Sequence, residues 1–149
     1  SIPDLKAKPI IDIDIVIKDY DIFLEVSERL EKLGYKHNGD QGVLHREAFK
    51  RAKEHIPYTI PERIWMNHHL YVCPEFSEEL KRHLLLRNYL RIHEASRRAY
   101  ERIKIDIVAR SNDDRKIYAT IKEDEYGHFF EKMLTDARAY FDSHPKEEP

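Results

Sequence analysis

The clearest pattern of hydrophobic and polar positions lies near the start of the chain. Residues 8–17 read Lys-Pro-Ile-Ile-Asp-Ile-Asp-Ile-Val-Ile. Isoleucine and aspartate alternate within this stretch, and β-branched residues dominate it, as is typical of a strand. Because side chains alternate between the two faces of a strand, Asp12 and Asp14 are expected on one face and the intervening isoleucines on the other. The pattern therefore predicts a strand that carries two neighbouring carboxylates.

The rest of the first half predicts one helix and further strands. Apolar residues recur at helical spacing from Ile22 to Leu33, and Gly34 is a typical helix stop. On the last strand of this half, His69 and Tyr71 are expected to share one face. The expected elements are a helix over 22–33, strands over 35–37 and 43–49 around a hairpin turn, an irregular loop over 50–64 with a possible helical turn near 51–55, and a strand over 64–73.

The second half is predicted to be helical. Ser77 is a good N-cap, and the two glutamates after it suit the positive end of a helix dipole. The apolar side of this helix is expected to consist of Phe76, Leu80 and Leu84. A second, cationic stripe is expected from His83, Arg87 and Arg91, which follow one another at intervals of four residues. Further helices are expected over 94–109, 115–121 and 124–141. The fold class is therefore α+β, with a small mixed sheet flanked by at least four helices.

Length and composition narrow the class of protein. The 149 residues, 41% hydrophobic and 36% charged, predict one globular domain over 1–142 and a polar tail over 143–149. A net charge of -2 gives no bulk attraction to nucleic acid or to a membrane, so neither is expected as a partner. Cys73 is the only cysteine, which favours the reducing cytoplasm. The start at Ser1 without methionine suggests that residues are missing before it.

The paired aspartates are the first candidates for chemistry. Burying an unpaired carboxylate costs several kcal/mol, and two carboxylates this close disfavour each other's ionisation. Asp12 and Asp14 are therefore expected to face solvent, to hold a divalent cation, or to meet basic side chains. Mg²⁺ or Mn²⁺ suits an oxygen-only pair, and we expect it to bind weakly until a triphosphate completes its ligands.

Basic residues elsewhere in the chain could balance this charge. We expect Arg46, Arg87 and Arg91, with His69, to converge on the aspartate pair and to line a phosphate-binding groove, because guanidinium groups bind phosphate bidentately. Lys8, at the start of the strand, could also reach phosphate or could be a solvated loop residue. Each of these residues also has an alternative role without a ligand. His69 could be a sheet histidine with an ordinary hydrogen bond, and Arg87 and Arg91 could be solvated or form salt bridges with neighbouring side chains.

Several segments together resemble the GrpB family, a branch similar to the polymerase-β-like nucleotidyltransferase superfamily. The two most specific are Lys8-Pro9-Ile10-Ile11-Asp12 and Arg87-Asn88-Tyr89-Leu90-Arg91. The others are residues 2–13 as a whole, 33–35, Arg46, 68–72, 82–84, Tyr100, Lys104, Arg115, Tyr118 and Lys122. The likeness covers nearly the whole chain.

The resemblance implies a small mixed sheet flanked by helices, with a phosphate-holding Gly-Ser turn ahead of Ser1. It also implies that Asp12 and Asp14 are catalytic metal ligands. A third carboxylate is expected on a later strand, where this chain has His69 and Tyr71, and Glu47 on the hairpin is an open candidate for that role.

Two functions follow from the resemblance. In the first, a nucleotidyltransferase, an acceptor hydroxyl or amine attacks the α-phosphorus of a nucleoside triphosphate and releases pyrophosphate. The residues expected to neutralise the phosphates are Lys8, Arg46, His69, Arg87 and Arg91. In the second, a non-catalytic relative binds a nucleotide or a protein partner, in a chaperone-like or regulatory role. The two retained acids favour the first function and the missing third acid favours the second.

Overall fold

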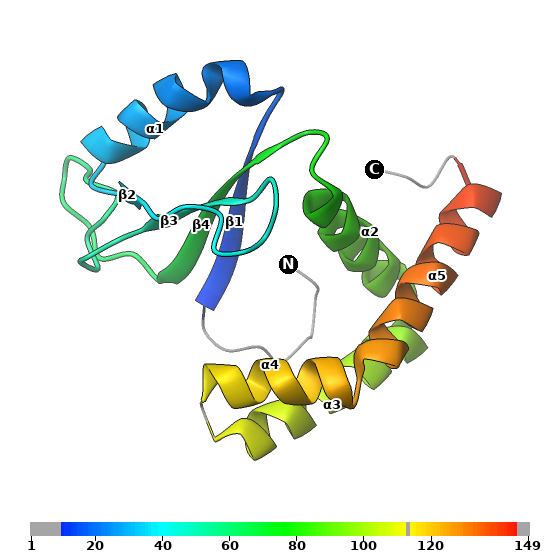
Figure 1. The fold of residues 1–149 in the computed structure, drawn as a ribbon. Helices are drawn as coiled ribbons and strands as arrows, with labels where there is room; N and C mark the ends of the chain where they lie inside the picture. Colours follow the sequence, from blue (N-terminus) through cyan, green and yellow to red (C-terminus); the bar gives the residue numbers. More distant parts are fainter. Residues whose placement is uncertain (1–9, 113, 146–149) are drawn as a thin grey trace. The chain divides into compact units, whose positions relative to one another are not determined.

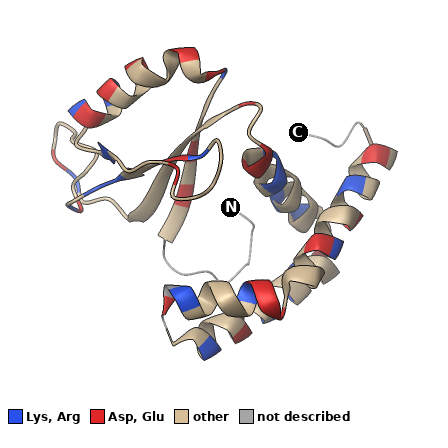
Figure 2. Ribbon diagram, in the orientation of Figure 1, with Lys and Arg blue, Asp and Glu red and all other residues tan. Residues whose placement is uncertain are grey.

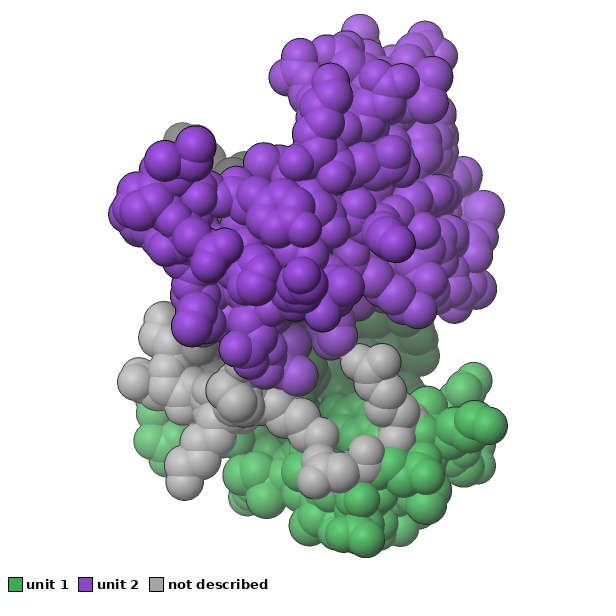
Figure 3. Space-filling model, turned by 90° about the vertical axis from the view of Figure 1, so that its left-hand side faces the viewer, with its two compact units in different colours: residues 1–6, 82–149 green, residues 7–81 purple. Residues whose placement is uncertain are grey.

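The computed structural model describes residues 10–112 and 114–145. The chain divides into two compact units (Figure 3), which we call the sheet unit, residues 7–81, and the helical unit, residues 1–6 and 82–149. The described residues form a four-stranded mixed sheet and five α-helices, which confirms the predicted α+β class. That residues 1–142 act as one domain stays a prediction.

The sheet combines one parallel and two antiparallel pairs (Figure 1). Its strands are β1 Ile10–Ile17, β2 Lys36–His37, β3 Glu47–Lys50 and β4 Asn67–Pro74, in the spatial order β1-β4-β3-β2. β1 runs parallel to β4, and β3 runs antiparallel to both β4 and β2. The predicted aspartate-bearing strand is therefore an edge strand of this sheet.

One face of the sheet forms the core of the sheet unit together with α1, Phe23–Lys32 (Figure 1). The buried members of this core are Ile17, Leu30, Tyr35, Phe49, Ile56, Leu70 and Val72. The predicted helix stop is confirmed at Gly34, which has a φ of 99°. A Cβ atom there would lie 2.7 Å from Cε2 of Tyr58, so both the backbone angle and the packing require glycine.

The connections of the sheet unit differ from the prediction in two places. β2 and β3 do pair, but β3 begins only at Glu47, and residues 38–46 form a loop rather than a tight hairpin turn. Positive φ values at Gly39, Gln41, Gly42 and His45 turn the chain repeatedly and prevent an extended strand.

The loop before β4 has no helix near residues 51–55, but it does contain a single hydrogen-bonded turn there, in which the Ile56 N–H donates to the Lys53 carbonyl at 3.2 Å. Instead, the Arg51 guanidinium donates to the backbone carbonyls of Glu54, Ile56 and Trp65 and to Oδ1 of Asn67. One side chain therefore ties together both ends of this loop, which also contains two cis bonds, Ile56–Pro57 and Ile60–Pro61.

Four helices follow β4, as α2 Glu78–Ile92, α3 Glu94–Ser111, α4 Arg115–Asp124 and α5 Gly127–Ser143. The predicted N-cap is confirmed, because Oγ of the buried Ser77 accepts from the Leu80 N–H at 3.3 Å. The break between α4 and α5 falls at residues 125–126, so Asp124 ends α4 rather than beginning α5. The core of the helical unit consists of Tyr89, Leu90, Met133, Ala137 and Phe141.

The expected polar tail is only partly described. Ser143, which was expected to begin it, is the last residue of α5, and residues 146–149 lie outside the described residues. None of the helices in the described part of the chain combines the length and the apolar run needed to cross a membrane.

Candidate functional site

The parallel pairing of β1 and β4 determines which side chains accompany the aspartates. Asp12 lies opposite His69 and Asp14 opposite Tyr71 in the register of the two strands. Residues paired in this way project from the same face of a sheet. The other face carries Leu70 and Val72, which pack in the core with α1. We therefore call the surface made by Asp12, Asp14, His69, Tyr71 and Arg46 the Asp face.

The two carboxylates of this face differ in burial. Asp12 is exposed and Asp14 is half-buried, because β1 enters the core only towards its carboxyl end. The cost of burying charge, which led us to expect a neutralising partner, therefore applies to Asp14 rather than to Asp12. Asp12 matches the predicted alternative of a carboxylate that faces solvent.

Asp14 has a neutral neighbour in Cys73. The buried Cys73 thiol lies 4.0 Å from Oδ1 of Asp14 and donates to it. Burial, and secondly the charge of Asp14, raise the pKa of the Cys73 thiol to about 11, although Arg46 opposes the shift. Cys73 is therefore a neutral hydrogen-bond donor at physiological pH rather than a nucleophile.

Arg46 joins the Asp face from the residue before β3. Its guanidinium carbon lies 4.6 Å from the centroid of the Tyr71 ring, a cation–π arrangement. Its Nε atom is buried, and no atom of the described residues accepts a hydrogen bond from it. A buried donor without an acceptor is unfavourable, and a ligand oxygen would reach this atom only after the side chains that cover it move apart.

Glu47 is not the third carboxylate of the Asp face. It lies opposite Val72 and so projects from the other face of the sheet. Its Oε2 atom is 2.7 Å from Nε2 of His37, and its Oε1 atom accepts from the Tyr20 hydroxyl at 3.5 Å. The proposal that Glu47 could complete the metal ligands is therefore wrong.

The carboxylate oxygens of Asp12 and Asp14 are the kind of ligand that binds a hard cation weakly. Two carboxylates from alternate residues of one strand offer the oxygen ligands that Mg²⁺ prefers, and water or substrate would supply the rest. Within residues 10–112 and 114–145, no group of three or more His, Cys, Asp or Glu side chains is placed to hold a metal ion. Asp12 and Asp14 therefore fit a site of the predicted kind, in which the protein contributes only part of the shell.

Two of the other predicted residues belong to the helical unit, and a third lies outside the described residues. Arg87 and Arg91 are on α2 within the helical unit, and their convergence on the Asp face stays a prediction. Nε and Nη2 of Arg87 donate to Oδ1 of Asn88 at 3.0 and 2.9 Å. Figure 2 shows the acidic positions on β1 and the basic positions along α2. Lys8 lies outside the described residues.

Sequence reasoning missed three aromatic residues at the sheet edge where β1 and β4 end. Phe76 was expected on the apolar side of α2, but it precedes that helix and is 45% exposed. Its ring centroid is 5.0 Å from that of His45 and 6.3 Å from that of Tyr20. The only signal in the sequence was that Tyr20 and Phe76 follow the ends of two predicted strands, where ligands often bind.

Comparison with known proteins identifies the family. The sequence model described as GrpB protein matches residues 1–135. The chain belongs to the GrpB family. This GrpB chain is 27% identical over 124 residues to UPF0157 protein YqkA of Bacillus subtilis, a match that covers 83% of this chain and 33% of YqkA. It is 26% identical over 124 residues to the glutamate-rich protein GrpB of Alkalihalophilus pseudofirmus, covering 83% and 68%.

A solved structure supports the same conclusion. The crystal structure of the conserved protein GrpB from Enterococcus faecalis matches with a TM-score of 0.69 and 25% identity, over 94% of this chain and 76% of that one. The predicted family and the predicted α+β fold are therefore both confirmed. The chain spans only about a third of YqkA, so that protein contains much that has no counterpart in these 149 residues.

Proposed function

We propose that this GrpB chain binds a nucleoside triphosphate together with Mg²⁺ on its Asp face, as a nucleotidyltransferase-like protein. One observation carries the proposal. Two carboxylates, Asp12 and Asp14, share a face with an arginine that is stacked on Tyr71 and whose buried Nε has no acceptor among the described residues. A ligand made of a metal ion and phosphate carries positive and negative charge together. Carboxylates can bind its metal ion while a nearby arginine binds its phosphate oxygens.

Each residue has a separate part in this binding. Asp12 and Asp14 would hold Mg²⁺ or Mn²⁺, which when bound supplies positive charge to the phosphate oxygens. Arg46 would donate a guanidinium hydrogen to a phosphate oxygen, and its contact with the Tyr71 ring would help to position the guanidinium. His69, beside Asp12, would donate to a second phosphate oxygen. That Lys8, Arg87 and Arg91 are further phosphate ligands stays a prediction.

Calorimetric titration with ATP across a range of Mg²⁺ concentrations tests the proposal. Wild type should bind more tightly as Mg²⁺ rises, and Asp12→Asn and Asp14→Asn should each weaken binding about tenfold or more, because metal affinity follows the charge of the ligands. Asp142→Asn, an exposed acid on α5, makes the same charge change as a control. Equal binding by all four proteins, independent of Mg²⁺, would refute the site.

A non-catalytic nucleotide- or protein-binding relative is the second candidate. The position of Glu47 on the opposite face of the sheet favours this second candidate. Without Glu47, the Asp face has two carboxylates, whereas the resemblance to the nucleotidyltransferase superfamily implies three for the transfer reaction. Pyrophosphate release separates the candidates. Release from ATP by wild type, with hydroxyl and amine acceptors supplied, and its loss in Asp14→Asn would support transfer. Mg²⁺-dependent binding without release would support the non-catalytic relative.

A further inference from the structure

Three aromatic side chains of the sheet unit form a cluster at the edge of the sheet where β1 and β4 end. The His45 and Phe76 rings meet edge to face with centroids 5.0 Å apart, and Tyr20 lies 6.1 Å from His45 and 6.3 Å from Phe76. We call Tyr20, His45 and Phe76 the aromatic trio. The rings come from three segments that are far apart in the sequence, so the tertiary fold brings them together.

The trio lies where the sheet topology favours ligand binding. β1 and β4 are parallel, so their carboxyl ends share one edge of the sheet, and Tyr20 and Phe76 follow Ile17 and Pro74 at those ends. β3 runs antiparallel to β4, which brings His45, just before β3, to the same edge. The carboxyl ends of parallel strands are the usual position of ligands in sheets flanked by helices.

Two of the three rings are exposed, and the third, His45, is half-buried. Phe76 is 45% exposed and Tyr20 is 37% exposed, so neither ring is buried as a core residue would be. The Tyr20 ring makes an edge contact with Phe23 at a centroid distance of 5.8 Å, and its hydroxyl donates a long hydrogen bond of 3.5 Å to Glu47. Exposed aromatic area that is already ordered binds a ligand with little loss of conformational entropy.

The backbone at His45 is unusual. Its φ is 59°, in the left-handed region that non-glycine residues seldom adopt, and such strained positions cluster at functional sites. The turn lets consecutive side chains meet different partners, since the His45 ring contacts Phe76 while Arg46 lies over Tyr71. The aromatic trio therefore begins one residue from the arginine of the Asp face.

We infer that the aromatic trio is a platform on which the nucleobase of the triphosphate ligand stacks, with its phosphates reaching Arg46. This inference rests on the proposed function, because the Asp face supplies the phosphate end of the ligand. Stacking on exposed aromatic rings accepts any nucleobase, since every base has a flat π-face. The trio therefore adds affinity for the base without selecting among bases.

Two ligands separate the platform from the phosphate site. Calorimetry with Mg²⁺ present compares ATP with inorganic tripolyphosphate, which has the phosphates and no ring. Wild type should bind ATP about 5- to 150-fold more tightly than tripolyphosphate, the range that base stacking produces. Phe76→Leu, which removes the ring and keeps an apolar side chain, should lose most of this preference and bind tripolyphosphate unchanged.

Matched variants control for folding and for general aromatic loss. Phe76→Tyr keeps the ring and should retain the preference for ATP. Tyr58→Leu removes a ring that is 49% exposed in the same unit but outside the trio, and it should also retain the preference. Thermal melts should show that all three variants fold.

The outcomes distinguish the two proposals. If wild type binds tripolyphosphate and ATP equally, or if Phe76→Leu keeps the preference for ATP, the platform is overturned and the phosphate site stands. If wild type binds neither ligand, the proposed function fails, and the platform fails with it.

Discussion

At the scale of single residues, Arg46 combines a favourable and an unfavourable environment. Its guanidinium lies over the Tyr71 ring, which is worth about 0.5–1 kcal/mol or more. Its buried Nε has no acceptor among the described residues, which costs about 1–3 kcal/mol. The cost is about equal to the gain or larger, so the folded protein gains little stability from this arginine. A residue of this kind is better explained by ligand binding than by stability.

The replacement Arg46→Met tests that explanation. Methionine can still pack on Tyr71, and it removes both the charge and the unsatisfied donor, so the free energy of unfolding should stay within about 1 kcal/mol of wild type. Affinity for Mg²⁺–tripolyphosphate should fall about tenfold or more, because a charge-assisted hydrogen bond is lost. Chemical denaturation and calorimetry measure the two quantities.

Arg46→Lys is the control, because it keeps the charge and loses the planar donor group. It should bind tripolyphosphate with an affinity between those of wild type and Arg46→Met. A loss of several kcal/mol of stability in Arg46→Met, with binding unchanged, would make Arg46 a structural residue instead.

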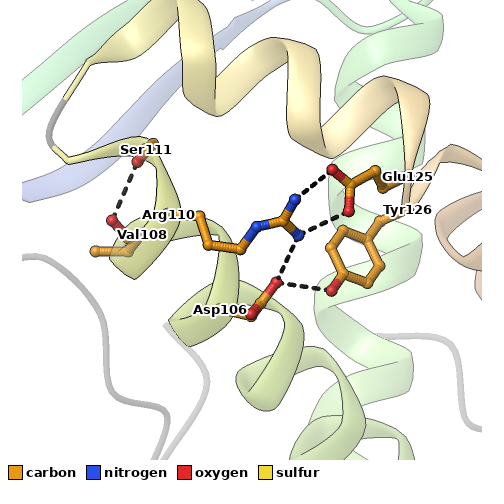
Figure 4. A network of polar contacts seen from close by, with 6 residues as sticks. All are labelled: Asp106, Val108, Arg110, Ser111, Glu125 and Tyr126. Carbon is orange, nitrogen blue, oxygen red and sulfur yellow. Dashed lines mark hydrogen bonds and ion pairs between the residues drawn. The ribbon is translucent and has the colours of Figure 1, made fainter.

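At the scale of elements, a polar network connects α3 to the turn between α4 and α5 (Figure 4). Nη1 of Arg110 donates to Glu125 at 2.7 Å and to Asp106 at 3.1 Å, and Nη2 also donates to Glu125. The Tyr126 hydroxyl donates to Asp106 at 2.7 Å. A bidentate arginine is the strongest form of such a contact, even where the side chains are partly exposed.

This network should make the stability of the helical unit depend on pH. The Tyr126 and then the Arg110 hydrogen bonds lower the pKa of Asp106, and the Arg110 hydrogen bonds lower the pKa of Glu125. A lowered pKa in the folded state stabilises the protein above the ordinary carboxyl pKa of about 4, and this stabilisation is lost as the pH falls through the folded value.

Melting temperatures of wild type and Arg110→Gln at pH values from 7 to 2 test the network. The variant should melt at a lower temperature at neutral pH, and the difference should shrink as the pH falls below about 4. Arg98→Gln, which breaks a single ion pair with Glu94 on α3, is a matched control that should show a smaller difference. A difference for Arg110→Gln that does not change with pH would contradict the role of the carboxylates.

At the scale of the whole molecule, α2 connects the two compact units. The helix runs from Glu78 to Ile92 and passes from the sheet unit into the helical unit at residue 82. Helix formation is cooperative, so order in one part of α2 favours order in the next. A chain of 149 residues is also within the size at which single domains unfold in one transition. We therefore expect the two units to unfold together.

Two core substitutions test this cooperativity. The probes are the fluorescence of Trp65, the only tryptophan, which lies in the sheet unit, and far-UV circular dichroism, which the helical unit dominates. Ile56→Ala in the sheet unit and Ile107→Ala in the helical unit remove buried side chains that are 2% and 0% exposed. Each should cost about 2–5 kcal/mol and lower the urea midpoint of both probes equally. If each variant changed only its own unit's probe, the chain would consist of two independent domains.

The sequence by itself determined most of the elements and the faces of the strands. The alternation of isoleucine and aspartate predicted β1 and the shared face of Asp12 and Asp14, and helical spacing with Gly34 predicted α1 and its end. These features are local, because the conformation of each residue follows from its neighbours within a few positions along the chain. The N-cap at Ser77 is another local feature that the sequence predicted.

Only the tertiary structure decided how these elements combine into a site. The parallel register places Asp14 opposite Tyr71, and the pairing of Glu47 with Val72 turns Glu47 away from the Asp face. The trio of Tyr20, His45 and Phe76 meets only because three strand ends share one sheet edge. Strand order and register depend on contacts between segments far apart in the chain, and the period of a single strand carries no information about its partner.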